Sequence, residues 1–289
     1  MNPVPFSLGP ALLFCPADRP DRFAKALDRA DAVVLDLEDG VGPDAKESAR
    51  QAVVDTPLDP ARTIVRVNPA GTPEHAADLA ALAGTAYRTL MLPKADGRFV
   101  GPLVRPDGTP YAVVALCETA SGVAAAAALA ARPDVVALAW GAEDLVASLG
   151  GTSSRRADGR YRDVARHARS AVLLAAGAVG KAAIDAVHLD LDDLDGLRAE
   201  ALDAAAVGFV ASLCVHPSQV PVIRAAYAPT PDDVAAAREV LAAAAGAPGA
   251  FALDGRMVDG PVLEQAHAVL RRAGLGTRRD DRDHEEVRR

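Results

Sequence analysis

The sequence has few aromatic residues, which make up 4% of its 289 positions, and it contains only three cysteines. Cys15, Cys117 and Cys214 lie inside apolar runs, and no two of them form a CxxC pair. We therefore expect three small buried residues in a reducing compartment, with a catalytic cysteine as the weaker alternative. A disulfide framework is not expected.

The sequence also lacks an excess of positive charge, with 31 Lys and Arg against 39 Asp and Glu. The net charge is −8 and no basic stripe is present, so nucleic acid is not an expected partner. The N-terminal stretch MNPVPFSLGP lacks the basic and long apolar regions of a signal peptide. No run approaches the roughly 20 apolar residues that a membrane span needs. We expect a cytoplasmic protein that does not bind a membrane.

Half of the residues are hydrophobic, and many of them fall in eight short apolar runs that alternate with longer amphipathic segments. Such runs are typical of strands buried on both faces, and the segments between them are typical of helices. No GxGxxG follows the first run, which argues against a dinucleotide-binding sheet. The pattern predicts an α/β fold, a (β/α)8 TIM barrel. The runs are 11–17, 32–39, 62–68, 89–95, 111–119, 135–144, 181–190 and 209–217.

The domain organisation follows from where this alternation changes. The stretch DGRFVGPLVRPDGTP, between the fourth and fifth runs, is rich in Gly and Pro, so the fourth helix should be short or missing. We expect residues 1–228 to form the barrel. Residues 229–276 should form a C-terminal helical extension, a lid packed on the barrel or on a neighbouring subunit. The mixed charge run 277–289 should be a disordered tail.

Charged and polar residues stand where the apolar runs end. Catalytic groups of barrel enzymes lie at the carboxyl ends of strands, and buried charges are costly unless they are paired or metal-bound. Any one of these residues could be structural, but together they indicate an active site. They are Glu38, Asp39, Arg66, Lys94, Glu118, Glu143, Asp144 and His216.

Glu118 and Asp144 end adjacent runs and could hold one Mg²⁺, which usually takes one or two carboxylates plus water and substrate. A bound 2-oxo acid would chelate this metal, and Arg66 would bind the substrate carboxylate bidentately. The residues just before Asp144 should line the substrate site: Gly141, Ala142 and Glu143.

Lys94 and the histidines leave other chemistries to weigh. Lys94 could form a Schiff base at a strand end, but the carboxylate pair favours ion pairs with the acidic groups. His75, His167 and His267 lie in helix patterns and are expected at the surface. No two histidines have metal-ligand spacing with a carboxylate, so zinc is not expected.

From about residue 11 to residue 274 the chain resembles the citrate lyase beta subunit-like proteins of the HpcH/HpaI aldolase superfamily, and most of all their stand-alone actinobacterial form. The resemblance rests on ordered motifs: LLFCPADRPDRFAKAL, VVLDLEDGV, IVRVNP, LMLPKA, ALCETASGV, WGAEDLVASLG, GGTSSRRADGRYRDVARH, CVHPSQ and RMVDGPVL.

The resemblance implies a Mg²⁺-dependent carbon–carbon lyase that forms a homotrimer or hexamer. Its reaction would cleave or form a 3-hydroxyacyl-CoA thioester, such as citryl-, malyl- or citramalyl-CoA, to give an acyl-CoA and a 2-oxo acid: oxaloacetate, glyoxylate or pyruvate. By the same resemblance Glu118 and Asp144 bind the metal, Arg66 the substrate, and Glu38 lies near the metal water. Asp259 would act at a neighbouring subunit's site, and His216 with Pro217 would border the CoA adenine.

One departure from the family pattern concerns the thioester side. Many members carry an Arg-Ser pair just before the first strand, where this chain has Pro10 and Ala11.

Three alternative functions stay open: a free-acid 4-hydroxy-2-oxo-acid aldolase, a phosphoenolpyruvate-using enzyme on a similar barrel, and a lyase subunit that works only within a larger complex. No phosphate-binding loop supports the second.

Overall fold

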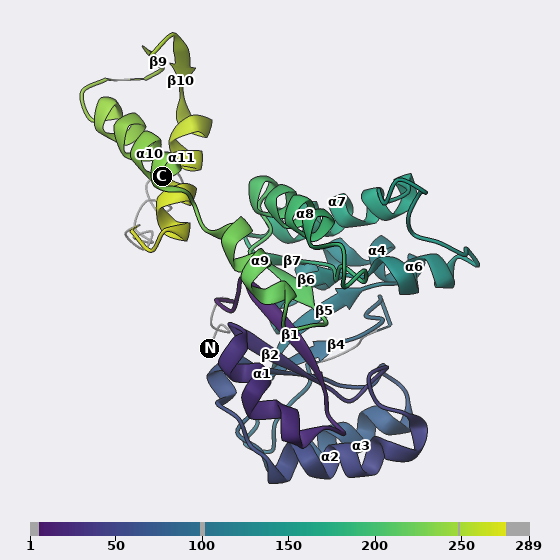
Figure 1. Cartoon of the computed structure of the whole chain (residues 1–289). Coiled ribbons are helices and arrows are strands. Elements are labelled where there is room, and N and C mark those ends of the chain that lie inside the picture. Colours follow the sequence, from purple (N-terminus) through teal and green to yellow (C-terminus); the bar gives the residue numbers. More distant parts are fainter. Residues whose placement is uncertain (1–5, 99–101, 248, 276–289) are drawn as a thin grey trace. The chain divides into compact units, whose positions relative to one another are not determined.

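Eight parallel strands close into a barrel (Figure 1). The structure is a computed structural model that describes residues 6–98, 102–247 and 249–275. Neighbouring strands pair in chain order, and β8 closes the ring against β1. The predicted (β/α)8 TIM barrel is therefore confirmed. The strands are β1 (Ala11–Pro16), β2 (Ala32–Asp36), β3 (Thr63–Arg66), β4 (Thr89–Leu92), β5 (Ala112–Cys117), β6 (Val135–Trp140), β7 (Ala182–Asp185) and β8 (Ala211–Cys214).

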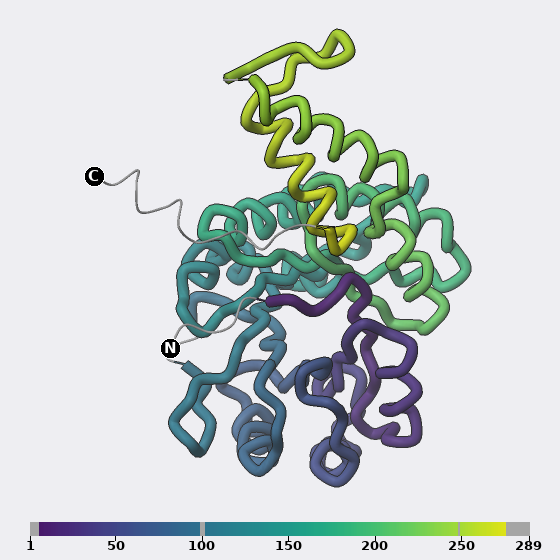
Figure 2. Tube along the Cα trace, turned by 90° about the vertical axis from the view of Figure 1, so that its left-hand side faces the viewer, coloured from purple at the N-terminus to yellow at the C-terminus, as the bar shows by residue number. Residues whose placement is uncertain are grey.

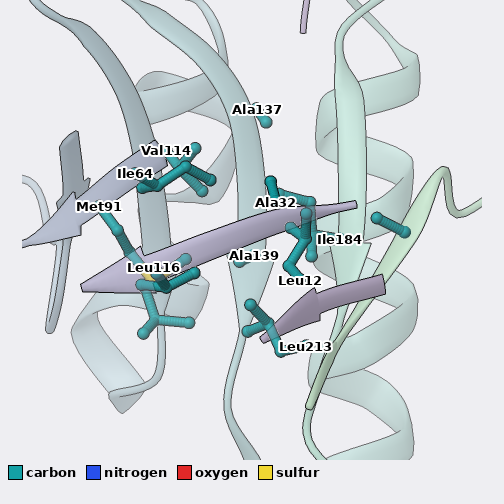
Figure 3. Close-up of a cluster of buried hydrophobic side chains, with 12 residues drawn as sticks. Leu12, Ala32, Ile64, Met91, Val114, Leu116, Ala137, Ala139, Ile184 and Leu213 are labelled. Atoms are coloured by element: carbon teal, nitrogen blue, oxygen red, sulfur yellow. The ribbon is translucent and has the colours of Figure 1, made fainter. Parts of the chain in front are cut away.

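Apolar side chains from all eight strands pack together in one core cluster (Figure 3). Side chains alternate between the two faces of a strand, so every second residue of each apolar run faces this cluster. Leu12, Met91 and Leu213 come from distant parts of the sequence and are all buried here. Burial on this scale, at about 25 cal/mol per Å² of apolar surface, holds the strand ends in fixed places around one rim.

Helices alternate with the strands and lie around the barrel (Figure 2). The stretch between β4 and β5 has no helix in its described residues, 93–98 and 102–111, as its Gly- and Pro-rich sequence predicts. Among the described residues, no helix has both the length and the apolar character needed to cross a membrane. The helices are α1 (Phe23–Arg29), α2 (Lys46–Asp55), α3 (Pro73–Leu82), α4 (Ala120–Ala124), α5 (Ala126–Ala130), α6 (Ala142–Ser148), α7 (Asp163–Gly177), α8 (Leu194–Val207) and α9 (Gln219–Tyr227), with 3-10 turns η1 (Pro20–Arg22), η2 (Pro43–Ala45) and η3 (Pro60–Arg62).

The chain divides into two compact units, Met1–Arg224 and Ala225–Arg289. The second contains α10 (Pro231–Ala244), the two-stranded hairpin β9 (Phe251–Leu253) and β10 (Arg256–Val258), and α11 (Gly260–Arg272). A capping box between Thr230 and Asp233 starts α10. Asp254 and Gly255 both have positive φ, which a tight two-residue hairpin turn requires. A lid role for this unit stays a prediction, and the predicted tail, 277–289, lies outside the described residues.

Candidate active site

The carboxyl ends of the strands surround a cavity of about 400 Å³. All strands of a parallel barrel end on the same rim, so residues far apart in the sequence can meet there. Glu38 joins the site through ion pairs with Arg66 and Lys94. The predicted residues that line the cavity itself are Asp39, Arg66, Glu118, Gly141, Ala142, Glu143 and Asp144.

Glu118 directly follows β5, and its side chain is buried. Its Oε1 accepts a hydrogen bond from the backbone N–H of Lys94, with 2.9 Å between the two heavy atoms. Burial raises the pKa of Glu118 to about 8, and the charges of Asp144 and Glu38 act in the same direction. A cation bound here would relieve this electrostatic cost.

Asp144 lies in the first turn of α6, and 38% of its side-chain surface is exposed. Its charge raises the pKa of Glu118, so the two carboxylates are electrostatic neighbours. No group of three or more His, Cys, Asp or Glu side chains that could hold a metal ion occurs among the described residues. Two carboxylates beside an open cavity nevertheless fit Mg²⁺, because water and substrate commonly complete its coordination.

Arg66 closes β3 and is held by two acidic residues. Its Nε and Nη2 donate to the two carboxylate oxygens of Asp36 at 2.8 and 2.6 Å, and its Nη1 lies 3.0 Å from Glu38 Oε2. The guanidinium also lies over the ring of Phe14, 4.7 Å from the centroid. These contacts fix the plane of a group that recognises carboxylates bidentately.

The sequence did not single out Asp36, the partner that fixes Arg66. Asp36 faces Arg66 in the parallel register of β2 and β3. It also accepts hydrogen bonds from the backbone N–H groups of Glu38 and Gly40 at 2.9 and 2.8 Å, so it shapes the turn that carries Glu38. A signal was present in the motif DLED, because residues two apart on an extended chain point to the same side.

Glu38 is buried, and its backbone is anchored by Lys46 in α2. Lys46 Nζ donates to the carbonyl oxygens of Leu37 and Glu38, each at 2.7 Å. Burial raises the pKa of Glu38, although the positive charges of Arg66 and Lys94 oppose the rise. Glu38 is thus a carboxylate with a fixed position and an increased proton affinity.

Lys94 forms the ion pairs expected of it. Its Nζ contacts Glu38, and it lies 3.4 Å from both Asp39 Oδ2 and Asp144 Oδ1. Burial lowers the pKa of Lys94, but the hydrogen bond to Glu38 and the surrounding negative charges outweigh burial and raise it above the usual value. A Schiff base needs a neutral amine, so this environment argues against that alternative.

Gly141 connects β6 to α6, and Ala142 and Glu143 are the first two residues of that helix, directly before Asp144. Glu143 Oε1 accepts a hydrogen bond from the hydroxyl of the buried Ser154. Gly141 directly follows Trp140, whose indole N–H donates to Asp185 at 2.6 Å. The segment is therefore braced at both ends, and Asp144 projects from a fixed helix start.

Apolar side chains also line the cavity, and we call them its apolar wall. This wall comes from β1, the ends of β5 and β6, and the segments that end or follow β7 and β8. A site with one charged and one apolar wall suits a ligand that carries both a carboxylate and hydrocarbon groups. The apolar lining residues are Phe14, Pro16, Leu116, Trp140, Val187, Leu189, Leu213 and Val215.

The residues expected on the thioester side are His216, Pro217 and Asp259. His216 and Pro217 are not among the cavity-lining residues, and His216 Nδ1 lies 2.8 Å from Ser218 Oγ. Asp259 belongs to the second unit, where its carboxylate caps α11 by accepting from the backbone N–H of Val262 at 3.4 Å. Their roles toward CoA and in catalysis stay predictions.

His75 is buried, so the expectation of a surface position is wrong. His75, Asp78 and Leu82 are the buried residues of α3, and their spacing places them on one face of the helix. The ring Nδ1 lies 2.8 Å from the carbonyl oxygen of Asn68. A polar partner at the end of β3 therefore allows a histidine on the inner face of this helix.

A larger cavity of about 750 Å³ lies beside α7 and α8, but its charges are already paired. Among its lining residues, Arg169 Nη2 lies 2.9 Å from Asp185 Oδ2. Arg156 and Arg160 pair with Asp163 and Asp158 at 3.0 and 2.6 Å. The cavity at the carboxyl ends of the strands, where the catalytic groups of barrel enzymes lie, is therefore the candidate active site.

A (β/α)8 barrel with neighbouring carboxylates and a fixed arginine at its carboxyl rim defines the class: a barrel enzyme with an acidic, arginine-containing active site. The chain belongs to the HpcH/HpaI aldolase/citrate lyase family, whose model matches residues 11–99 and 103–217. The predicted enzyme class, a carbon–carbon lyase, is confirmed, since its relatives are lyases.

Three similar proteins illustrate this membership. The citrate lyase subunit beta-like protein of Mycobacterium tuberculosis is 59% identical over 269 residues, which cover 93% of this chain and 97% of that protein. The L-malyl-CoA/beta-methylmalyl-CoA lyase of Cereibacter sphaeroides is 33% identical over 298 residues, covering 91% and 94%. The crystal structure of protein CitE from Mycobacterium tuberculosis with magnesium, acetoacetate and coenzyme A superimposes with a TM-score of 0.86 at 59% identity, covering 93% and 99%.

Proposed function

We propose that this chain is a Mg²⁺-dependent lyase that cleaves or forms a 3-hydroxyacyl-CoA thioester, such as citryl-, malyl- or citramalyl-CoA. The products of cleavage would be an acyl-CoA and a 2-oxo acid. One observation carries the proposal: Glu118, Asp144 and Arg66 line a single cavity at the carboxyl rim of the barrel. The solved CitE structure, which holds magnesium and coenzyme A, supports both the metal and the thioester.

Glu118 and Asp144 would hold the magnesium, which when bound polarises the oxygen that becomes the oxo group and stabilises its negative charge. Arg66 would bind the substrate carboxylate through N–H donors. Asp36 and Glu38 orient Arg66 before the substrate arrives, which reduces the entropic cost of reaching the reactive geometry.

Glu38 would take the hydroxyl proton of the substrate, since its pKa is raised and its position is fixed by Asp36 and Lys46. The C–C bond then breaks, and its electron pair moves to the α-carbon of the acyl-CoA as an enolate. Asp259 of a neighbouring copy would protonate that carbon in cleavage and deprotonate it in synthesis. Reversal of these proton transfers allows either direction.

His216 and Pro217 would border the CoA adenine, and the apolar wall would contact the hydrocarbon part of the substrate. Pro10 and Ala11, in place of the family's Arg-Ser pair, imply that other groups contribute to binding on the thioester side. We also propose a cytoplasmic homotrimer or hexamer, on the strength of the family resemblance. Light scattering of the purified chain would determine its oligomeric state.

A metal-dependent activity screen tests the proposed function. Citryl-, malyl- and citramalyl-CoA would be offered with Mg²⁺ or with EDTA, and oxaloacetate, glyoxylate or pyruvate would be measured. Acetoacetate, the ligand in the solved relative, is a 3-oxo acid, so 3-hydroxy-3-methylglutaryl-CoA belongs in the same screen. We expect cleavage of at least one thioester that needs Mg²⁺ and is lost in Glu118→Gln.

The same screen separates the alternatives. Cleavage of free 4-hydroxy-2-oxo acids without CoA would identify a free-acid aldolase. Activity that appears only with added partner subunits and a carrier-protein thioester would identify a subunit of a larger complex. Full activity of Glu118→Gln, or equal activity in EDTA, would contradict the metal assignment.

A further inference from the structure

Lys94 contacts both of the carboxylates that are proposed to hold magnesium. Its backbone N–H donates to Glu118 Oε1 at 2.9 Å, and its Nζ lies 3.4 Å from Asp144 Oδ1. Lys94 follows β4 and Pro93. Its backbone φ is +50°, a left-handed conformation that residues other than glycine rarely adopt. Non-glycine residues in this region tend to occur at functional sites, where the surrounding structure holds them in place.

The ammonium group of Lys94 lies among the acidic residues of the site. It contacts Glu38 and Asp39 as well as Asp144, and 31% of its side-chain surface is exposed. Arg66, which lines the same cavity, is already engaged by Asp36 and Glu38. Lys94 therefore supplies the positive charge closest to Asp144 among the ion pairs of this site.

We propose that Lys94 is a positioning residue whose ammonium stands in for magnesium in the metal-free enzyme. It orders Asp144 before the metal arrives and is displaced from that carboxylate when Mg²⁺ binds, while Glu38 and Asp39 retain it. The backbone N–H keeps Glu118 in place in both states. This inference rests on the proposed function, because it takes Glu118 and Asp144 as the magnesium ligands.

The arrangement has a measurable consequence for metal affinity. A fixed positive charge beside the site competes with the metal for Asp144 and repels it, so the two carboxylates bind Mg²⁺ more weakly than they would alone. In the metal-free protein, the same positive charge reduces the electrostatic repulsion between the acidic side chains of the site. A residue that only braced the ligands would have the opposite effect on affinity when removed.

Calorimetric titration of Mg²⁺ into EDTA-treated and dialysed protein tests the proposal without relying on activity. We expect Lys94→Met to bind Mg²⁺ about tenfold or more tightly than the native chain, since one nearby positive charge is lost. Without metal this variant should melt at a lower temperature than the native chain, and Mg²⁺ should raise its melting temperature further. Lys94→Arg keeps the charge and should resemble the native chain in both measurements.

Lys25→Met is the matched control, because Lys25 is exposed on α1 and its loss should leave Mg²⁺ affinity unchanged. If Lys94→Met does not fold, Lys94→Gln removes the charge with a polar side chain and is titrated in its place. Equal or weaker Mg²⁺ binding by the neutral variant would overturn the stand-in role alone. Absence of Mg²⁺ binding by the native chain would instead contradict the proposed function.

Discussion

Gly141 gives the carboxylate of Glu118 the space that it occupies. A Cβ atom on Gly141 would lie 2.9 Å from Glu118 Oε2 and 3.0 Å from Glu118 Cβ. The backbone of Gly141 is extended, with φ −135° and ψ 133°, which any residue adopts. Glycine is therefore needed here for space and not for conformation.

We predict that Gly141→Ala moves Glu118 and weakens Mg²⁺ binding while the barrel still folds. A displacement of about 1 Å at a catalytic group can cost roughly 100-fold in rate, so lyase activity should fall by about that factor. Mg²⁺ titration and steady-state kinetics would measure the two effects. Gly84→Ala is the control, because a Cβ there meets nothing within 4 Å. Native Mg²⁺ affinity in Gly141→Ala would contradict the prediction.

Glu118 should also make the metal-free protein sensitive to pH. Its pKa is raised from 4.5 to about 8 by burial, with Asp144 and Glu38 adding to the rise. Between these values the native state binds more protons than the unfolded chain, so the free energy of unfolding falls as the pH rises. Urea unfolding in EDTA, from about pH 5 to about pH 8, should show this loss of stability.

Glu118→Gln should flatten that dependence, leaving only the smaller contribution of groups such as Glu38. Mg²⁺ affinity of the native chain should increase over the same pH range, because the metal binds the deprotonated carboxylate. An unchanged slope of stability against pH in Glu118→Gln would show that another group titrates. Calorimetry in buffers of different ionisation enthalpy would count the protons released on Mg²⁺ binding.

Arg66→Lys should mainly raise KM for the thioester. Lysine keeps the charge but cannot reproduce the two-oxygen contact with Asp36 or the planar recognition of a carboxylate. Hydrogen bonds to charged groups contribute about 1.5–3 kcal/mol, so kcat/KM should fall roughly 10- to 100-fold. Arg98→Lys is the control, since that exposed arginine pairs with Asp96 in the segment between β4 and β5. A purely kcat effect would contradict a binding role.

Asp259 can be tested by mixing subunits. Asp259→Asn and Glu118→Gln should each be inactive as pure proteins. If Asp259 serves a neighbouring subunit's site, random mixed oligomers should recover about a quarter of native activity, because half of the sites have an intact metal pair and half of their neighbours an intact Asp259. If Asp259 acts within its own chain, every subunit carries one defect and no activity returns.

The eight strands could be predicted because each one is encoded by a continuous apolar run of the sequence. Each apolar run of the sequence contains a strand of the barrel, and several of the charged residues that end these runs line one cavity at the rim. Glu118, Asp144 and Arg66 were found because charged residues at the ends of buried strands are conspicuous. These features need only periodicity and the rule that parallel strands end together.

Which side chains pair with one another in and near the site could not be predicted in the same way. Asp36 pairs with Arg66 through strand register, and His75 is buried because Asn68 offers it a carbonyl oxygen. Such pairings depend on contacts between residues that the sequence pattern does not link. The left-handed backbone of Lys94 has no signal in LMLPKA either, because only the assembled site holds it.

Most of the apolar wall comes from segments other than those that carry the carboxylates and Arg66, and this separates reaction chemistry from substrate choice in the gene. Mutations at Val187, Leu189, Leu213 and Val215 reshape the apolar wall without changing the carboxylates, Arg66 or the Phe14 ring that packs on Arg66. A duplicated copy can therefore drift toward a new acyl group while its catalytic capacity stays under purifying selection. A saturation library confined to those four codons would explore the same path in the laboratory.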